Sequence, residues 1–251
     1  VLDLTRIIAG PTAGRILASH GAQVLAISAA HLPSVFPLVV DSGRGKRQAA
    51  LDLRSAEGRE TLRGLVREAD VFVQGYRPGG LAALGFSQEE LLALNPSLVV
   101  ATLSAYGRLG PWAGKRGFDS LTQTATGLNW AEAEAFGEAT PRALPCQALD
   151  HGAGHLLAFG VMAALARRAR EGGGARVEIS LAQVARFLRS LGRVAPDRAA
   201  RADDAPFLQD IDSGFGRLTA TTPATILAAT PARYELPSMP LGSHPPVWEA
   251  S

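Results

Sequence analysis

The stretch VLDLTRIIAGPTAGRILASHGAQVLAIS, residues 1–28, decides the fold. Two short apolar runs, 1–5 and 23–28, stand on either side of the segment TAGRILASHGA. Short apolar runs of this kind are typical of parallel strands buried on both faces, and the segment between them predicts a helix. The opening of the chain therefore predicts a strand, a crossover helix and a second, parallel strand.

The same alternation continues through most of the chain. Further strands are predicted at 49–53, 70–76 and 97–107, and another follows the turn EGGG at 171–174. Ser55 is placed to cap a helix whose buried stripe is Leu62, Leu65 and Val66. A short helix is expected at 87–96, and longer ones at about 118–128, 150–170 and 180–193. This order predicts an α/β fold with a doubly wound, Rossmann-like parallel sheet and flanking helices.

Composition limits the function classes. With 251 residues and 26.2 kDa the chain can bury one large core, and its apolar runs are broken well short of the roughly 20 residues of a membrane span. The first residues carry no basic n-region, so no signal peptide is expected. Cys146 is the single cysteine, which fits a reducing cytoplasm. A net charge of +2 with scattered arginines favours small anionic ligands over a nucleic-acid surface.

The stretch at 193–206 interrupts this pattern. It is charged and poor in large apolar residues, so it is predicted to be a linker between a large domain at 1–192 and a C-terminal segment at 207–251.

Ligands of open parallel sheets bind beyond the carboxyl ends of the strands. After the first strand, Gly10, Pro11 and Thr12 come just ahead of a helix whose N-terminus suits an anion. The loop lacks the G-x-G-x-x-G spacing, so a plain tight turn stays an equal alternative.

Two further segments carry basic residues. Arg44, Lys46 and Arg47 are predicted in a glycine-bearing loop before a strand, suited to phosphate groups but also typical of an ordinary solvated surface. Tyr76 and Arg77 follow the strand near 70–74, on a turn fixed by Pro78 and Gly79.

An aspartate and a histidine open the apolar helix near 150. Asp150 is positioned to cap the helix by accepting hydrogen bonds from its free N–H groups. His151 and His155 have the spacing of helical metal ligands, but the motif HGAGH lacks the glutamate of H-E-x-x-H and has no evident third ligand. We therefore expect no metal site.

Taken in order, several segments resemble the class III CoA-transferase family, which includes formyl-CoA transferase, the carnitine CoA-transferase and α-methylacyl-CoA racemase. They are LDLTRIIAGP, GRGKRQAALDLRSAEGRE, YRPGGLAALGF, LNPSLVVATLSAYGRLGPW, GFDSLTQTATG, ALDHGAGHLLAFGVMAALARR and GGGARVEISLAQVA. The ending TPARYELPSMPLGSH is similar to the segment with which the family's chain returns to its large domain.

The resemblance implies a mechanism and a set of site residues. Asp150 matches the family's catalytic carboxylate, which attacks an acyl-CoA thioester and carries the acyl group covalently. Coenzyme A or acyl-CoA would be a substrate rather than a permanent cofactor, and a carboxylic acid would be the acceptor. The predicted CoA contacts are Gly10, Pro11, Thr12, Arg44, Lys46, Arg47, Tyr76, Arg77 and Leu84.

The resemblance also implies a homodimer of interlocked chains, in which 1–192 is the CoA-binding domain and 207–251 completes it. The resemblance places the family's small domain around 193–206, where only fourteen residues stand, so that domain is expected to be either absent from the protein or left out of this sequence. This leaves a non-catalytic CoA-binding or partner subunit as the alternative. A racemase is disfavoured because Phe118 replaces the histidine that the racemases use there as an acid/base group.

Overall fold

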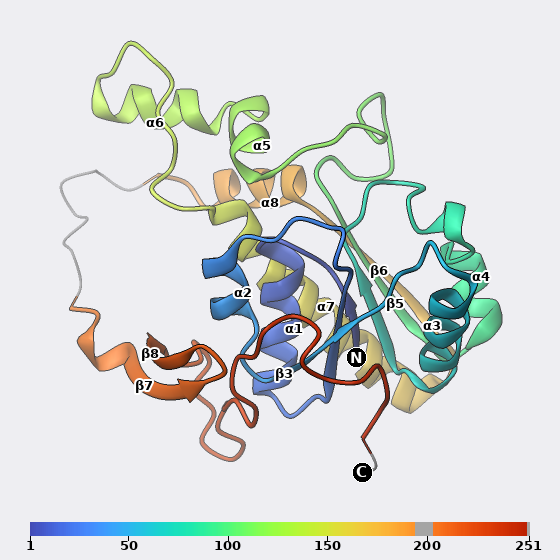
Figure 1. Cartoon of the computed structure of the whole chain (residues 1–251). Helices are drawn as coiled ribbons and strands as arrows, with labels where there is room; N and C mark the ends of the chain where they lie inside the picture. Colours follow the sequence, from blue (N-terminus) through green and yellow to red (C-terminus); the bar gives the residue numbers. More distant parts are fainter. Residues whose placement is uncertain (194–202, 250–251) are drawn as a thin grey trace.

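A computed structural model describes residues 1–193 and 203–249. Its centre is a six-stranded sheet in the order β3-β2-β1-β4-β5-β6, with every neighbouring pair parallel (Figure 1). The strands are β1 (Leu2–Leu4), β2 (Val24–Ser28), β3 (Lys46–Ala50), β4 (Val71–Gln74), β5 (Val99–Ser104) and β6 (Ala175–Ser180). The doubly wound α/β prediction is confirmed.

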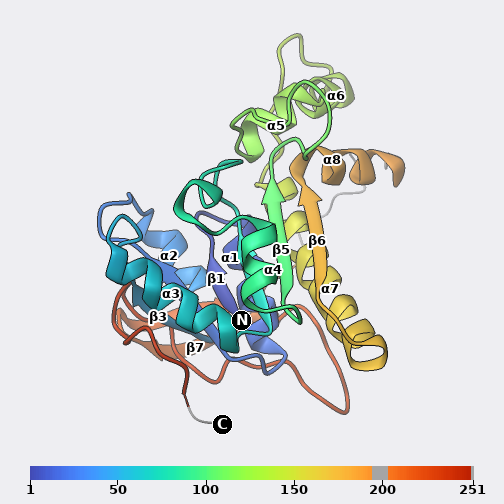
Figure 2. The same ribbon diagram turned by 90° about the vertical axis from the view of Figure 1, so that its right-hand side faces the viewer.

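Helices cover both faces of this sheet. One face packs on α1 (Ala9–Ser19) and α7 (Ala148–Glu171), and the other on α3 (Ala56–Glu68) and α4 (Gln88–Leu94). Ser55 caps α3 as predicted, its hydroxyl accepting the N–H of Gly58 at 3.0 Å. Figure 2 shows β5 and β6 running toward the end of the molecule where α5 (Asp119–Ala125), α6 (Leu128–Phe136) and α8 (Leu181–Ser190) gather.

Several boundaries differ from the sequence prediction. Strand β3 begins at Lys46 and not at Ala49, because its polar side chains find partners inside the protein. Helix α2 (Phe36–Ser42) and helix α6 were not predicted. Most of the predicted linker, 194–202, lies outside the described residues, and a short 3-10 helix at Ala205–Phe207 follows it.

The C-terminal part of the chain packs beside β3. The antiparallel hairpin of β7 (Leu208–Ser213) and β8 (Gly216–Thr221) forms a separate two-stranded sheet. Beyond it, the backbone N–H of Gly45 donates to Leu236 at 2.8 Å, and that of His244 donates to Gln48 at 2.9 Å. Trp248 closes the segment by donating to the carbonyl of Leu65 at 3.2 Å.

Among the described residues, α7 is the one helix whose length and hydropathy match those of a membrane span. The helix matches the predicted range of about 150–170 to within two residues at each end. Its buried residues, among them Leu157, Ala158 and Val161, pack with α1 and the central strands. The face of α7 that carries these three residues is therefore part of the core.

Helices α1 and α7 approach one another closely because glycine stands at the contact. A Cβ on Gly154 would lie 2.7 Å from the carbonyl oxygen of Ala9 and 2.7 Å from Cβ of Thr12. Both distances are below normal van der Waals contact, so no larger residue fits unless the helices separate.

The contact between α1 and α7 at Gly154 can be tested with a matched pair of substitutions. We expect Gly154→Ala to lower the free energy of unfolding by about 1–3 kcal/mol through overpacking. Gly64→Ala in α3 meets no atom within 4 Å, and we expect it to raise stability by roughly 0.5–1 kcal/mol through helix propensity. Urea unfolding measures both, and equal effects of the two substitutions would contradict the packing described here.

Candidate active site

Asp150 lies at the carboxyl edge of the sheet. Helix α7 connects the carboxyl end of β5, by way of α5 and α6, to the amino end of β6, so its first turn stands where the strands end (Figure 2). Asp150 is the third residue of this helix and is only 7% exposed. Within the described residues its carboxylate has no hydrogen-bond partner, so it is a buried acid that is free to act on something else.

The prediction that Asp150 caps α7 is wrong. The cap residue is Gln147, whose side chain makes no capping hydrogen bond. The first turn is held instead by Asp119 at the start of α5, whose Oδ2 accepts the backbone N–H of Asp150 at 2.8 Å. Gln123 donates to the same carboxylate and to the carbonyl of Cys146. A neighbouring helix therefore does the capping and leaves the Asp150 carboxylate available.

The electrostatic environment of Asp150 makes it an unusual carboxylic acid. Burial, and then the negative charge of Asp119, raise the pKa of Asp150 from 3.8 to about 7. A carboxylate that has lost its hydration is more basic than one in water, and a more basic carboxylate is a stronger nucleophile.

The two histidines of α7, His151 and His155, lie one turn apart near Asp150. Nδ1 of His155 lies 2.9 Å from the carbonyl oxygen of His151, one turn earlier on the same helix. Burial, followed by the charge of Arg15, lowers the pKa of His151. In the parts of the chain that the structure describes, no three histidine, cysteine or acidic side chains group as metal ligands.

A large cavity at this edge of the sheet lies between the ends of β2, β3 and β4. It has a volume of about 500 Å³ and a mostly apolar wall that includes Leu4, Leu51 and Leu81. Three predicted CoA-binding residues, Tyr76, Arg77 and Leu84, line it together. Arg54 and His31, which the sequence analysis did not single out, also line it and are exposed.

Gly10, Pro11 and Thr12 form the first turn of α1, and all three are buried. Gly10 lies directly against the side chain of Thr5, and Thr12 lies against Gly154 of α7. Their packing explains the small residues at these positions, and their contact with CoA stays a prediction.

The predicted loop before the strand holds for Arg44 but is wrong for Lys46 and Arg47, which belong to β3, and none of the three side chains lies on a solvated surface. The three residues are 1%, 2% and 5% exposed, at the amino end of β3, and each has partners inside the protein. Arg44 donates to the carbonyl of Thr221 and to Asp41, and Arg47 donates to the carbonyl of Val247. Binding of phosphate by these side chains would require these internal contacts to break.

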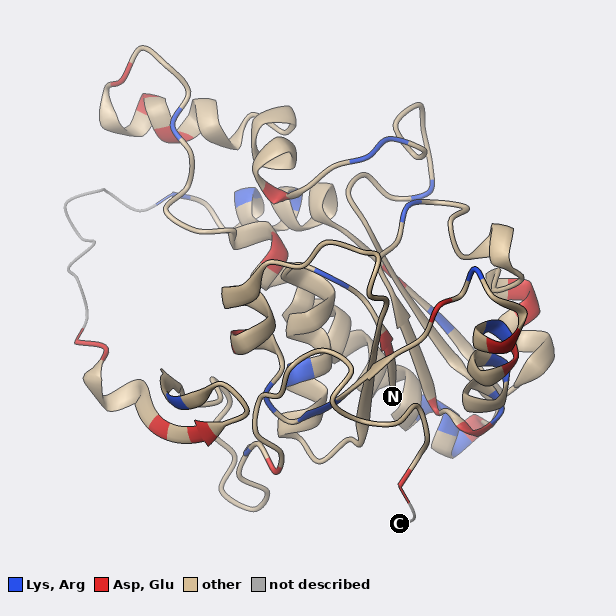
Figure 3. Ribbon diagram, in the orientation of Figure 1, with Lys and Arg blue, Asp and Glu red and all other residues tan. Residues whose placement is uncertain are grey.

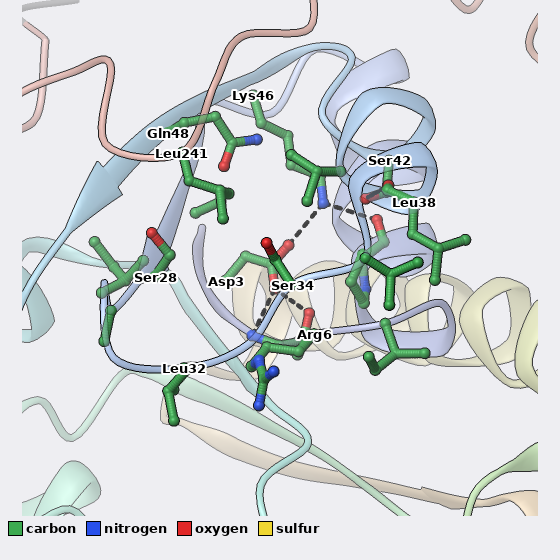
Figure 4. Close-up of a pocket in the computed structure, with 18 of the residues that line it drawn as sticks. Asp3, Arg6, Ser28, Leu32, Ser34, Leu38, Ser42, Lys46, Gln48 and Leu241 are labelled. Atoms are coloured by element: carbon green, nitrogen blue, oxygen red, sulfur yellow. Dashed lines mark hydrogen bonds and ion pairs between the residues drawn. The ribbon is translucent and has the colours of Figure 1, made fainter.

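Lys46 and Pro11 line a smaller cavity, of about 80 Å³, which lies between β2, β3, α1 and α2 (Figure 4). Asp3, Arg6 and Gln48 line it as well. The ammonium of Lys46 is 2.8 Å from Oδ2 of Asp3 and 2.8 Å from the carbonyl oxygen of Pro11. Away from this cavity, acidic and basic residues are interspersed, for example along α3 and its neighbouring loops (Figure 3).

The sequence analysis missed Asp3 and Asp119. Asp3 interrupts the apolar run of a strand buried on both faces, and a charge in such a place must have a buried partner. Asp119 follows Phe118 in the segment GFD, and its partner, the N–H of Asp150, lies 31 residues further along the chain. The sequence therefore carries a signal for Asp3 but none for Asp119.

Comparison with known proteins identifies the family. Residues 1–203 match CoA-transferase family III, and the chain belongs to this family. A probable fatty acyl-CoA transferase of Mycobacterium tuberculosis is 31% identical over 217 residues, which cover 79% of this chain and 55% of that protein. A formyl-CoA:oxalate CoA-transferase of Streptomyces coelicolor is 29% identical over 227 residues, covering 86% and 54%.

Solved structures agree with the fold. A crystal structure of the Mycobacterium tuberculosis protein superposes with a TM-score of 0.69 at 32% identity, over 76% of this chain and 54% of that one. A CAIB/BAIF family protein from Brucella suis superposes with a TM-score of 0.67 at 26% identity, over 86% and 63%. The chain thus spans about half the length of the relatives from Mycobacterium tuberculosis and Streptomyces coelicolor.

The raised pKa of Asp150 predicts how stability depends on pH. Between pH 4 and 7 the folded protein keeps a proton on Asp150 that the unfolded chain releases, so the free energy of unfolding falls as pH rises. Asp150→Asn carries no charge and avoids this loss. At pH 8 we expect the variant to be more stable than the wild type by on the order of 2–4 kcal/mol.

The difference should vanish near pH 4, where both side chains are neutral. Urea unfolding at several pH values measures it. A difference that stays constant from pH 4 to pH 8 would show that Asp150 is not a buried acid with a raised pKa.

Proposed function

We propose that the protein moves CoA from an acyl-CoA to a carboxylic acid and that Asp150 is the nucleophile. The observation that carries the proposal is the Asp150 carboxylate, which is 7% exposed, has no hydrogen-bond partner among the described residues and stands at the carboxyl edge of the sheet. Membership of CoA-transferase family III supports the reaction class. The names of the relatives, a fatty acyl-CoA and a formyl-CoA:oxalate transferase, support acyl-CoA as the donor.

The proposed reaction begins when the Asp150 carboxylate attacks the thioester carbonyl of the donor. The carbon–sulfur bond breaks, and an aspartyl anhydride and CoA thiolate are formed. The thiolate then attacks the Asp150 carbonyl of the anhydride, which releases the first acid and leaves an aspartyl-CoA thioester. The acceptor carboxylate repeats the exchange, takes CoA and restores Asp150. Each step preserves the activation of the thioester, so no outside energy source is needed.

The larger cavity is the proposed site for the nucleotide end of CoA. Its apolar wall suits a base, and the exposed cation of Arg77 at its edge suits phosphate groups. Arg54 is also exposed there, but its guanidinium is paired with Asp52 at 2.7 Å. Tyr76 and Leu84 contribute to the wall. Charge attraction of this kind weakens as salt screens it.

Substitution of Asp150 tests the proposed reaction. Asp150→Asn keeps the size of the side chain but cannot form the anhydride, so we expect transferase turnover to fall by about three orders of magnitude or more while CoA affinity is kept. In the wild type, kcat/KM should rise with pH through about 7, because the ionised carboxylate is the nucleophile.

Arg77→Ala is the matched control, because it should impair CoA binding and not the chemical step. It should weaken CoA binding, measured by calorimetry at low salt, with little change in kcat at saturation. Full turnover by Asp150→Asn would contradict the covalent mechanism. Loss of turnover in a wild type that still binds CoA would favour the alternative of a CoA-binding partner subunit.

We also propose that the protein is a cytoplasmic homodimer. Large apolar side chains remain exposed on α7 and at α8, with Phe159 at 67%, Phe187 at 48% and Leu191 at 67%. A second copy that covers them would remove this surface from water. Light scattering at micromolar concentration should therefore give twice the chain mass, and a monomer would contradict the proposal.

A further inference from the structure

A buried ion pair lies beneath α1 and links the edge strand β3 to the central strand β1. The side chains of Lys46 and Asp3 are each 2% exposed, with Nζ and Oδ2 separated by 2.8 Å. The Lys46 ammonium also donates to the carbonyl oxygen of Pro11 in the first turn of α1, at 2.8 Å. One charged group therefore holds a strand and a helix at once (Figure 4).

Glycines bring the backbone of α1 down onto this pair. A Cβ on Gly14 would collide with the Asp3 carboxylate and would lie 2.9 Å from Nζ of Lys46. One turn earlier, Gly10 lies against the side chain of Thr5, which itself donates from its hydroxyl and its backbone N–H to Oδ1 of Asp3. Polar contacts thus help to position the first two turns of α1, in addition to the apolar packing of Ala13 and Leu17.

The connection between β1 and α1 passes through an unusual conformation. Ile7 has φ 73°, which makes it the one non-glycine with positive φ among the described residues. A β-branched residue avoids this region, and such strain persists only where the surrounding structure enforces it. The contacts of Asp3 with Thr5 and of Lys46 with Pro11 lie on the two sides of Ile7 and can enforce it.

The same turn of α1 sets the start of α7. Gly154 packs against the carbonyl of Ala9 and against Thr12. Asp150 precedes Gly154 by four residues, so both lie on the face of α7 that meets α1. A shift of the first turn of α1 would therefore be passed to the turn that carries Asp150.

We infer that Lys46 is a positioning residue: together with Asp3 it fixes the first turn of α1 and, through Gly154, the placement of Asp150. The inference rests on the proposed function of Asp150 and gives Lys46 a role other than the predicted phosphate contact. A buried ion pair adds little net stability over apolar residues of equal size, because loss of hydration offsets the attraction. The distinctive contribution of the Lys46–Asp3 pair is to fix the position of the first turn of α1.

Three variants test the inference. Lys46→Met keeps most of the length of the side chain but leaves the Asp3 charge buried without its partner, so the variant should be less stable and slower. In the double variant Asp3→Asn/Lys46→Met no buried charge is left unpaired, and stability should return toward that of the wild type. Leu62→Ala is the control, because this fully buried leucine belongs to the core on the opposite face of the sheet.

The kcat values of these variants separate a misplaced Asp150 from a general loss of stability. Neither Lys46→Met nor the double variant can donate to Pro11, so both should lose about tenfold or more in kcat, since small misplacements of reacting groups cost this much. CoA affinity should change by less than about twofold in both, because the larger cavity is not lined by Lys46. Leu62→Ala should be less stable than the wild type with unchanged kcat.

Recovery of kcat together with stability in the double variant would overturn the inference, because Lys46 would then be merely structural. If the double variant stays unstable, its kcat is compared with that of Leu62→Ala at equal fraction folded. Equal values overturn the inference, and a lower value for the double variant supports it.

Hydrogen exchange supplies a readout that does not depend on transferase activity. Peptides covering 9–14 and 148–154 should exchange faster in both Lys46 variants, and the peptide covering 56–68 should not. The reverse pattern is expected for Leu62→Ala. A wild type without turnover would refute the proposed function, and the exchange pattern would still decide whether Lys46 holds these two helix starts.

Discussion

The structure depends on how closely α1 approaches its neighbours. Gly10 and Gly14 let its backbone rest on Thr5 and on the Asp3–Lys46 pair, and Gly154 lets α7 lie against its first turn. Every larger residue at these positions would push a layer away. The carboxyl edge of the sheet, where α1 and α7 both begin, takes its shape from this packing.

Asp150 shows what such rigid packing permits. A carboxylate without hydrogen bonds inside a protein is costly, and the nearby charge of Asp119 adds to the cost. A well-packed site holds the group in place despite that cost, as active sites commonly do. The same burial that lowers stability near neutral pH makes the carboxylate basic, which is the property a nucleophile for thioesters requires.

Much of the fold could be predicted from the sequence because its signals are local. The apolar runs at β1, β2, β4 and β5 and the cap at Ser55 gave the sheet and its crossovers. Strand β3 was placed three residues late because Lys46 and Arg47 look like surface residues until their distant partners, Asp3 and Val247, are known. Pairings across more than 40 residues leave no local pattern.

The candidate site was predictable only in part, again because contacts between distant residues leave no local pattern in the sequence. The family resemblance singled out Asp150, and the turn after β4 gave Tyr76 and Arg77 beside the larger cavity. The cap supplied by Asp119 could not be predicted, because it depends on α5 folding back onto α7.

The central claim, a covalent aspartyl intermediate, is tested most directly by trapping. Wild-type protein incubated with acyl-CoA and then hydroxylamine should gain the hydroxamate mass on the peptide containing CQALDHGAGH, at Asp150. No modification of that peptide with short, branched or dicarboxylic acyl-CoA donors would contradict the account.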